Sequence, residues 1–522
     1  MYSLLITSRL KDMEYYPKSQ VEQDKTMFKR KVIKPKIGLY GVGLKAYWPQ
    51  FDGLKKRLTD YISFVEKKLS AYGDVYNFGL VDDEVCGRLA GEFFNSNNVD
   101  IIFMYSATYC TSSCVLPIHQ ICSAPLVILN LQPTAQMNYM NTSTGQWLAH
   151  CGACPVPEFA NALERAGIKC RIINGLLGQS QTPEGSETDE VTEHRPEAIK
   201  AWKEVYEWCM AAKVKYMFRN ARFGFLGNNY SGMLDMYSDY TMLSAGLGLH
   251  IELIEMCDLE KQFKSVTEKE VKRKISEIKE FFLISGDSPS DPIARKPSEE
   301  QIFWSAKVAL AQEKMVMEYN LDSLTYYYHG ISDNYYERLQ SGFIVGHSLL
   351  TAGGIPCAGE GDLKTAVAMK ICDTLGIGGS FTEIAAVDYN LGTIILGHDG
   401  PFHMLISNGK PVLRGMGIYH GKRGSGVSVE ANVKTGDVTT LGITQTHDGL
   451  MKMIISEGEA IDQQTLMIGN TSTHVRFPLL PVEYMDKWFR EAPTHHCALA
   501  VGHNRRVLEK TADFLAIESV FI

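Results

Sequence analysis

Residues 36–43 read Lys-Ile-Gly-Leu-Tyr-Gly-Val-Gly, an apolar run that ends in a glycine turn, and this stretch decides the fold class. An amphipathic helical pattern follows it and stops at Gly73. Its apolar face consists of Leu54, Leu58, Tyr61, Ile62, Val65 and Leu69. A buried strand followed by such a helix is the repeating unit of a parallel sheet covered by helices. We therefore predict an α/β fold.

The same alternation of apolar run and helical pattern continues to about residue 174. Further apolar runs occupy residues 75–80, 100–105, 125–131 and 168–173. This pattern predicts a doubly wound, Rossmann-like domain over residues 32–212. The polar residues 1–31 are expected to be an extension before its first strand. Residues 180–196 are rich in Ser, Thr, Glu, Gly and Pro, which predicts a long surface loop.

A second block of strands and helices follows, and we predict a central, doubly wound α/β domain over residues 213–379. Its candidate strands are residues 214–226 and 250–256. A charged helix comes next, with an inward face of Val271, Ile275, Ile278 and Phe282. A buried helix is expected over about 302–317.

The pattern changes character from residue 380. Asn408-Gly409 and Thr435-Gly436-Asp437 punctuate runs of alternating polarity at 426–433 and 438–444. Such dipeptides between alternating runs are typical of β-hairpins. Residues 380–522 are therefore predicted to form a mainly antiparallel, β-rich C-terminal domain.

Composition excludes several classes of function. The 522 residues are too many for one core. With 52 Lys+Arg against 60 Asp+Glu, the net charge of −8 gives no basic surface for nucleic acid or an anionic membrane. No apolar run approaches the roughly 20 residues that span a bilayer. The 12 cysteines, several within apolar runs, suggest reduced thiols, and we expect a cytoplasmic protein.

Two motifs are weak on their own. Gly41-Val42-Gly43 lacks the third glycine of a dinucleotide fingerprint, and no phosphate-binding P-loop is present, so we expect no nucleotide cofactor. Cys151 and Cys154 have CxxC spacing, and Pro155 follows them as it would in a redox motif. No second CxxC exists to close a zinc site, which favours structural cysteines.

The region richest in chemistry begins at Glu360. This carboxylate stands in a glycine-flanked loop directly after an apolar run, and a helix is predicted to start near Asp362. A carboxylate beside a helix N-terminus is favoured in its ionised form, which suits a hard cation. Glu383, His398 and the pair His495-His496 follow at apolar runs. Each has an ordinary structural explanation, but together they are a sound ligand set for Mn²⁺ or Co²⁺.

The segment Ala-Gly-Glu-Gly-Asp-Leu-Lys-Thr-Ala at 358–366 resembles the signature of the L-arabinose isomerase family, within the L-fucose/L-arabinose isomerase fold. The order continues with Gly379-Ser380-Phe381-x-Glu383, Leu396-Gly397-His398 and His495-His496. Weaker similarity reaches back to Arg222-Phe223-Gly224. The chain thus resembles a divergent member of this family. The resemblance implies four metal ligands: Glu360, Glu383, His398 and His496.

The resemblance also implies an activity. It suggests a metal-dependent aldose–ketose isomerase that acts on an open-chain pentose or 6-deoxyhexose through an enediolate, with Glu360 and Glu383 as the acid/base pair. The implied cofactor is a divalent ion, Mn²⁺ first, with Co²⁺ or Mg²⁺ as alternatives. The implied assembly is a homo-oligomer, a trimer or a hexamer, with the metal between the central and C-terminal domains.

Two departures concern the substrate contacts. Ile384-Ala385 stands where the family has an acidic and an aromatic residue, and Leu131-Gln132-Pro133 stands where it has Phe-His-Thr. We expect the substrate contacts to include Gln132, His495 and Lys364, although for Lys364 the position in the sequence favours a solvated lysine. A rival interpretation is a catalytically inactive sugar-binding or regulatory protein that keeps the isomerase fold.

Overall fold

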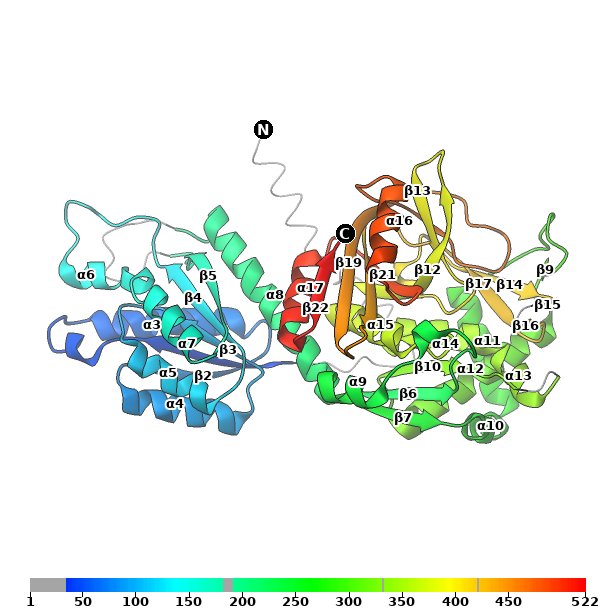
Figure 1. Ribbon diagram of the computed structural model, residues 1–522, viewed down its shortest axis with the longest axis horizontal. Coiled ribbons are helices and arrows are strands. Elements are labelled where there is room, and N and C mark those ends of the chain that lie inside the picture. The colour runs from blue at the N-terminus through cyan, green and yellow to red at the C-terminus, as the bar shows by residue number, and fades with distance from the viewer. Residues whose placement is uncertain (1–33, 182–190, 331–332, 420–421) are drawn as a thin grey trace. The chain divides into compact units, whose positions relative to one another are not determined.

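The computed structural model describes residues 34–181, 191–330, 333–419 and 422–522 (Figure 1). The predicted extension at 1–31 lies outside these ranges, and so do residues 182–190 of the predicted loop. Contacts divide the chain into two compact units, one of Val32–Tyr216 and one that contains Met217–Ile522. Both are mixtures of helices and sheets, as the sequence predicted.

The unit of residues 32–216 is built on a five-stranded parallel sheet with the order β2-β1-β3-β4-β5. Every strand predicted from an apolar run is confirmed. The strands are β1 (Lys36–Val42), β2 (Asp74–Val81), β3 (Ile101–Tyr105), β4 (Leu126–Gln132) and β5 (Cys170–Leu176).

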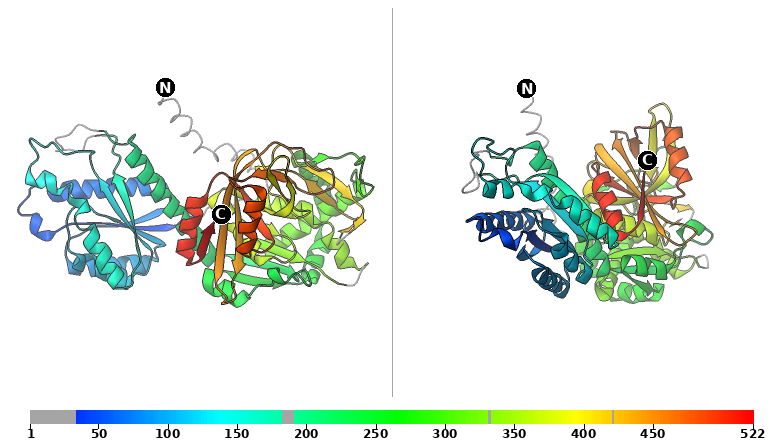
Figure 2. Two further views of the ribbon diagram at one scale, coloured as in Figure 1. Left: turned by 45° about the horizontal axis from the view of Figure 1, so that its top comes forward. Right: turned by 60° about the vertical axis from the view of Figure 1, so that its left-hand side comes forward.

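Helices cover both faces of this sheet (Figure 2). On one face α4, α5 and α7 share a hydrophobic cluster with the strands. On the other, α3 meets α8 through the ring contact of Phe64 with Trp202. All six residues of the predicted apolar face of α3 are buried. The helices are η2 (Lys45–Tyr47), α3 (Leu54–Leu69), α4 (Glu84–Asn97), α5 (Ser112–Ile121), α6 (Thr144–Leu148), η3 (Cys151–Ala153), α7 (Val156–Arg165) and α8 (Pro196–Arg219).

The unit of residues 217–522 contains a second parallel sheet, with the order β11-β10-β6-β7. Its strands are β6 (Arg222–Gly227), β7 (His250–Ile254), β10 (Ser323–Tyr327) and β11 (Cys357–Ala358). The strand predicted over 214–226 is wrong in its first half, because α8 continues to Arg219. Val214 and Phe218 are both buried, at the four-residue spacing of a helix face.

The helices of this unit pack around one continuous hydrophobic cluster. The predicted helix over 302–317 is confirmed within α12, and Val271 and Ile278 of α11 face inward as expected. The helices are η4 (Leu234–Met236), α9 (Tyr240–Leu247), α10 (Met256–Ser265), α11 (Glu268–Phe281), α12 (Glu299–Tyr319), α13 (Tyr335–Gln340), α14 (Phe343–Ala352), α15 (Leu363–Leu375), η5 (Met404–Ile406), α16 (Pro481–Arg490) and α17 (Arg505–Leu515).

A seven-stranded sheet forms the β-rich part of the same unit. Its order is β18-β21-β12-β13-β20-β19-β22, and β19 also pairs with β18, so that six strands close on themselves. All pairings are antiparallel except that of β19 with β22. The strands are β12 (Gly378–Asp388), β13 (Thr393–Gly397), β18 (Gly436–Gln445), β19 (Met451–Ala460), β20 (Thr473–Arg476), β21 (His496–Val501) and β22 (Glu518–Phe521).

Smaller sheets complete the unit. Strand β14 pairs with β17, β8 and β9, and β15 pairs with β16. The expectation that Thr435-Gly436-Asp437 turns a hairpin is wrong, because β17 and β18, on either side of it, belong to different sheets. These strands are β8 (Leu283–Ile284), β9 (Ala294–Arg295), β14 (Val412–Met416), β15 (Ile418–Tyr419), β16 (Lys422–Arg423) and β17 (Val427–Glu430).

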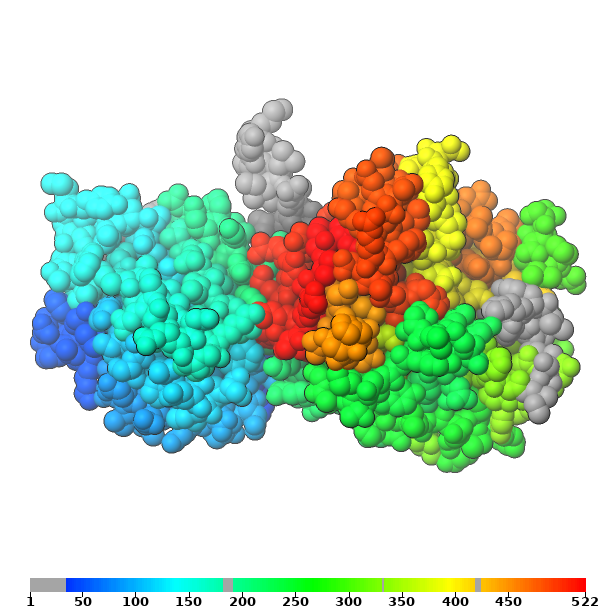
Figure 3. All heavy atoms as spheres, in the orientation of Figure 1, coloured from blue at the N-terminus to red at the C-terminus, as the bar shows by residue number. Residues whose placement is uncertain are grey.

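Helix α15 joins the parallel sheet to the closed sheet. All of its residues are buried, and it contacts β10 and β11 on one side and β12, β18 and β21 on the other. By contrast, Figure 3 shows α16 and α17 at the surface of the unit, in orange to red. The loop that precedes α15, which carries Glu360, is therefore held between the two sheets.

The first predicted domain boundary lies four residues from the division between the two units at 216/217, whereas no division between units falls at the second. The boundary at 212/213 falls inside α8, and the boundary at 379/380 falls inside β12. Residues on both sides of the second boundary share one hydrophobic cluster, which contains Leu324 of the parallel sheet and Leu499 of the closed sheet. Among the helices of the described ranges, none combines the length and apolarity that crossing a membrane requires.

Candidate metal centre

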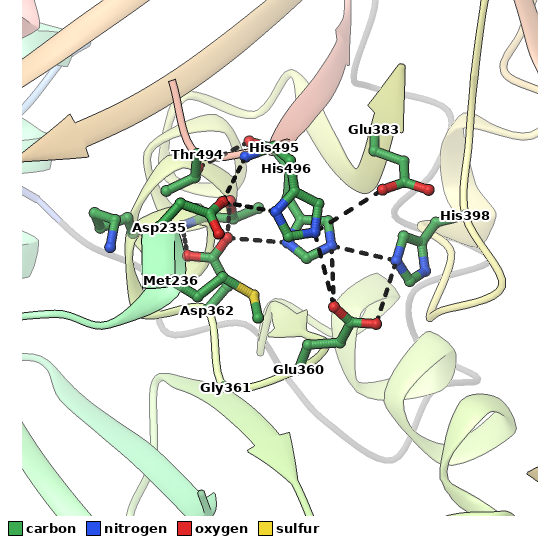
Figure 4. A network of polar contacts seen from close by, with 12 residues as sticks. Asp235, Met236, Glu360, Gly361, Asp362, Glu383, His398, Thr494, His495 and His496 are labelled. Carbon is green, nitrogen blue, oxygen red and sulfur yellow. Dashed lines mark hydrogen bonds and ion pairs between the residues drawn. The ribbon is translucent and has the colours of Figure 1, made fainter. Parts of the chain in front are cut away.

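Four residues that the sequence singled out converge within the unit of residues 217–522 (Figure 4). Glu360 precedes α15, Glu383 lies in β12, His398 follows β13 and His496 begins β21. Two overlapping sets of ligand atoms each lie within 4.8 Å of one another: Glu360 with His495 and His496, and Glu383 with His398 and His496.

Strand register explains why distant residues meet here. On β12, Glu383 stands directly opposite His496 of β21 and, on the other side, opposite Gly397 of β13. Residues directly opposite in neighbouring strands place their side chains on the same face of a sheet. His398 continues the chain after Gly397, and the backbone N–H of His398 donates to Thr471 Oγ1 at 2.9 Å.

The imidazole and carboxylate atoms approach one another closely. His496 Nε2 lies 3.3 Å from His398 Nε2 and 3.6 Å from Glu360 Oε2. His398 Nε2 lies 3.9 Å from Glu360 Oε1. The His496 side chain is fully buried, whereas Glu383 is about one third exposed, at 34%. The centre is therefore shielded from solvent at His496 and accessible to solvent at Glu383.

Backbone strain is localised at Glu360. Its φ of +60° lies in the left-handed region, which a residue with a β-carbon enters at a cost of about 1–3 kcal/mol. The next residue, Gly361, also has a positive φ, and a β-carbon there would lie 2.7 Å from Asn228 O. The surrounding structure thus fixes the carboxylate of Glu360 in a conformation that a free loop would avoid.

Each of the two metal-ligand candidates among the histidines has a carboxylate at its other ring nitrogen. His496 Nδ1 lies 3.1 Å from Asp362 Oδ2 (Figure 4), and His398 Nδ1 lies 3.2 Å from Asp399 Oδ1. The hydrogen bond with Asp362 favours a proton on Nδ1 of His496 and leaves its Nε2 lone pair for a cation, whereas Asp399 lies at ion-pair distance from His398 without a hydrogen bond. Nε2 of both rings faces the centre of the cluster.

Asp362 has a second role as the N-cap of α15. It accepts hydrogen bonds from the backbone N–H of Thr365 at 3.0 Å and from the Thr365 hydroxyl at 2.8 Å. Burial opposes its ionisation, but the contact with His496 and the charge of Lys364 hold the pKa of Asp362 below its usual value. The carboxylate is therefore ionised where it orients His496.

The electrostatics of the centre favour a cation. Burial opposes ionisation of Glu360, yet the neighbouring histidines lower the pKa of its carboxyl. Burial lowers the pKa of His496, which keeps this ring neutral near pH 7. Glu360 Oε2 is buried and accepts no hydrogen bond within the described residues. Ionised carboxylates, the neutral imidazole of His496 and an unsatisfied buried oxygen fit a divalent ion of the Mn²⁺ or Co²⁺ type.

A cavity of about 60 Å³ opens beside Glu360 and His398. Three tyrosines and Ile344 give it apolar walls, while Gln340, Ser341 and Asp399 add polar groups. Its lining consists of Tyr230, Tyr326, Tyr327, Gln340, Ser341, Ile344, Gly359, Glu360, His398, Asp399 and Gly400. This described lining contains no lysine or arginine.

The three expected substrate contacts have different positions. His495 lies at the centre, with Nε2 3.8 Å from Glu360 Oε2 and 4.0 Å from Glu383 Oε2. Lys364 is buried, so the alternative of a solvated lysine is wrong. Its ammonium donates to Tyr237 O at 3.2 Å and to Ser238 Oγ at 3.0 Å.

Gln132 belongs to the other unit. It lines a separate cavity of about 110 Å³ at the carboxyl ends of β3 and β4, together with Asn130 and His150. Its side-chain amide donates to Thr134 O at 2.7 Å. The Cys151–Cys154 motif also lies in this unit, in and just after η3, and Cys154 is exposed.

Sequence reasoning missed three carboxylates around the centre. Asp362 was recognised only as the start of a helix, although it also contacts His496. Asp399 adjoins His398 in the sequence, a signal that could have indicated a partner for that ring. Asp235 lies 260 positions from His495, which it contacts, and no local pattern links them.

Comparisons with known proteins were made for the whole chain. No family model and no curated protein matches it. Among solved structures, the chain is similar to the ligand-free, open structure of CD0873, a substrate-binding protein with adhesive properties from Clostridium difficile. The match has 13% sequence identity and a TM-score of 0.15, and covers 66% of this chain and 95% of that one. A TM-score this low carries no argument about fold or function.

Proposed function

We propose that the protein is a metal-dependent aldose–ketose isomerase, a divergent relative of the L-arabinose isomerases. The observation that carries this proposal is the convergence of Glu360, Glu383, His398 and His496. Two of the side chains come from strands and two from the loops after β11 and β13, and they gather around one centre with Nε2 of both histidines facing it. A random set of residues would not share a centre, a strand register and adjoining carboxylates at both imidazoles.

The residues of the centre would have three different roles. Glu360, Glu383, His398 and His496 would hold a divalent cation, which supplies electrostatic stabilisation of negative charge on neighbouring sugar oxygens. Asp362 keeps the imidazole of His496 oriented through a hydrogen bond, and Asp399 places a negative charge beside Nδ1 of His398. The fixed backbone of Glu360 holds its carboxylate in place before substrate arrives, which lowers the reorganisation that the reaction requires.

Isomerisation moves a proton between C2 and C1 of the open-chain sugar through an enediolate. One carboxylate takes the proton from C2, and a carboxylic acid returns it to C1. Glu360 and Glu383 are suited to this exchange because they flank one position. Nε2 of His495 lies 3.8 Å from Glu360 Oε2 and 4.0 Å from Glu383 Oε2. The lowered pKa of Glu360 keeps its carboxyl group ionised before substrate binds, as a general base requires.

The lining of the adjoining cavity supports an unphosphorylated sugar. Glu360 and Asp399 would repel a phosphate or a sugar acid, and no lysine or arginine in that lining would offset the repulsion. Tyr230 and Ile344 provide an apolar wall of the kind that suits a short carbon chain or a terminal methyl group. A pentose or a 6-deoxyhexose meets these requirements.

Further features of the proposal rest on the sequence. A contribution of Gln132 to substrate binding and a homo-oligomeric assembly follow from the family resemblance, a doubly wound arrangement for both parallel sheets follows from the strand–helix alternation, and a cytoplasmic location follows from the cysteines within apolar runs. The proposed metal is Mn²⁺ first, with Co²⁺ or Mg²⁺ as alternatives, and no nucleotide cofactor is proposed.

The test combines metal analysis with a ketose-formation assay. The protein would be measured as purified, after chelation and after addition of Mn²⁺, with a panel of pentoses and 6-deoxyhexoses. We expect about one divalent ion per chain and ketose formation that chelation abolishes and Mn²⁺ restores. Absence of metal uptake with excess Mn²⁺ would overturn the proposal and favour the sugar-binding interpretation.

Replacement of Asp362, whose carboxylate contacts Nδ1 of His496, should weaken metal binding. We expect Asp362→Asn to lower the affinity for Mn²⁺ by about 10-fold to 100-fold, because the amide lacks the negative charge that makes the ring basic. Asp83→Asn, which alters a comparable N-cap on α4, is the matched control. Calorimetric titration with Mn²⁺ measures both variants. Equal affinities for the two would contradict this role of Asp362.

Metal binding should also depend on pH. Burial lowers the pKa of His398, but Asp399 and the two glutamates outweigh it and raise that pKa above its ordinary value. A cation must displace this proton, so binding weakens as pH falls through the raised pKa. We expect the affinity for Mn²⁺ to rise between about pH 6 and pH 8, with release of protons. Titrations in two buffers of different ionisation enthalpy would show that release, and a pH-independent affinity would contradict it.

A further inference from the structure

The segment between β6 and α9, residues 228–239, is bound to the loop that carries Glu360. The backbone N–H of Tyr230 donates to Glu360 O at 2.9 Å, and the Asn229 side chain donates to Gly361 O at 2.7 Å. The ammonium of Lys364 donates to Tyr237 O and Ser238 Oγ. These bonds anchor the segment near both of its ends, so the residues between them have a defined position relative to Glu360.

Asp235 lies between these anchors and contacts His495 twice. Its Oδ2 accepts a hydrogen bond from the backbone N–H of His495 at 3.0 Å and lies 2.6 Å from His495 Nδ1 (Figure 4). One carboxylate oxygen therefore fixes both the backbone and the ring of His495. Because a carboxylate accepts and does not donate, Nδ1 of the ring carries a proton.

The consequence concerns the other nitrogen of the ring. With Nδ1 held by Asp235, Nε2 lies 3.8 Å from Glu360 Oε2 and 4.0 Å from Glu383 Oε2. These distances exceed a direct hydrogen bond and leave Nε2 accessible to a third group between the two carboxylates. His495 is about one third exposed, at 35%, so this position can be reached from solvent.

We propose that Asp235 is a positioning residue that acts through His495, and that Nε2 of His495 forms a hydrogen bond with a hydroxyl group of a polyhydroxylated substrate between Glu360 and Glu383. This inference rests on the proposed isomerase function. It adds a residue that no sequence motif indicates, and it gives His495 a defined hydrogen-bonding atom.

The position of the pair argues against a purely structural role. The side chains of Asp235 and His495 are 38% and 35% exposed, so their contact is not part of the hydrophobic core. A pair this exposed adds little to folding stability. Its loss should therefore change substrate handling and leave the fold and the metal in place.

The experiment uses the full chain loaded with Mn²⁺ and compares Asp235→Ala, Asp235→Asn and the control Asp239→Ala. Asp239 lies on the same segment but caps α9 through Met242 N and does not contact His495 in the described structure. Steady-state kinetics on the best sugar of the panel give kcat and KM. Calorimetry with a five-carbon sugar alcohol, L-arabinitol, gives a binding constant that does not depend on turnover. Metal content and Tm are measured for every variant.

We expect Asp235→Ala to lower kcat/KM by about tenfold or more and to weaken L-arabinitol binding, with metal content and Tm unchanged. Asp235→Asn keeps an acceptor oxygen for both N–H groups and should restore most of the loss. Asp239→Ala should retain the binding and kinetics of the unmodified protein.

A double-mutant cycle with His495→Gln separates action through His495 from an independent effect. If Asp235 acts through that ring, Asp235→Ala causes little further loss in the His495→Gln background. Additive losses, or an Asp235→Ala variant with unchanged kcat/KM and L-arabinitol binding, would overturn the inference. An unmodified protein that takes up Mn²⁺ but isomerises no sugar would contradict the proposed function instead, and L-arabinitol binding would still test the contact.

Discussion

Glu360→Gln and Glu383→Gln should each lower ketose formation by about 10²-fold to 10⁴-fold, the usual contribution of a positioned general acid or base. Glutamine has nearly the shape of glutamate but cannot take a proton from carbon. The effect of Glu360→Gln should be the larger one, because Glu360 is more buried and sits on a strained backbone. Initial rates of ketose formation on the best sugar of the panel measure both losses.

Controls separate loss of chemistry from loss of metal. Metal content should be determined for each variant at saturating Mn²⁺, so that rates are compared per bound ion. Glu459→Gln, an exposed carboxylate on β19, is the matched control and should retain full activity. Full activity in a metal-loaded Glu360→Gln or Glu383→Gln variant would overturn the mechanism.

The largest effect on stability is expected at a buried ion pair away from the metal centre. The guanidinium of Arg414 donates to both carboxylate oxygens of Glu430, at 2.7 and 2.9 Å, and also to Gly286 O. Their side chains are 2% and 5% exposed. Glu430 also accepts from the backbone N–H of Gly469 at 2.9 Å. The pair thus ties together β14, β17 and two loops.

Removal of one partner leaves the other charge buried without compensation. We expect Glu430→Ala to lower the free energy of unfolding by about 3–5 kcal/mol. Glu509→Ala breaks the exposed pair with Arg505 on α17 and should change stability little. Denaturant titration of both variants gives the comparison. A loss at Glu430 no greater than that at Glu509 would contradict the assignment.

The sequence predicted local elements well where one physical signal dominated. The apolar face of α3 matched residue by residue, because a surface helix must bury one stripe. The strand expected over 214–226 failed at its start, because a helix buried on most of its faces and a buried strand are equally apolar. The hairpin expected at Thr435-Gly436-Asp437 failed because turn residues indicate a turn but do not determine which strands pair.

In the candidate site, too, local features were predictable and long-range pairing was not. Glu360, Glu383, His398 and His496 could be proposed because each stands at a recognisable local motif. Their grouping depends on the register of β12 against β21 and β13, which no local pattern contains. Asp235 was missed for this reason, since only the folded chain brings it to His495. The burial of Lys364 was missed for the same reason, because its ammonium donates to Tyr237 O and Ser238 Oγ, which are distant in the sequence.

The closed sheet has a consequence for the order of folding. His496 contacts Asp362 across 134 positions of sequence and His398 across 98, so the centre cannot exist before β21 pairs with β12. Pairings between such distant segments form slowly, because the chain loses loop-closure entropy before any contact stabilises the pairing. Mn²⁺ added during refolding should therefore bind in a late kinetic phase, and the time of binding would report when β21 joins β12.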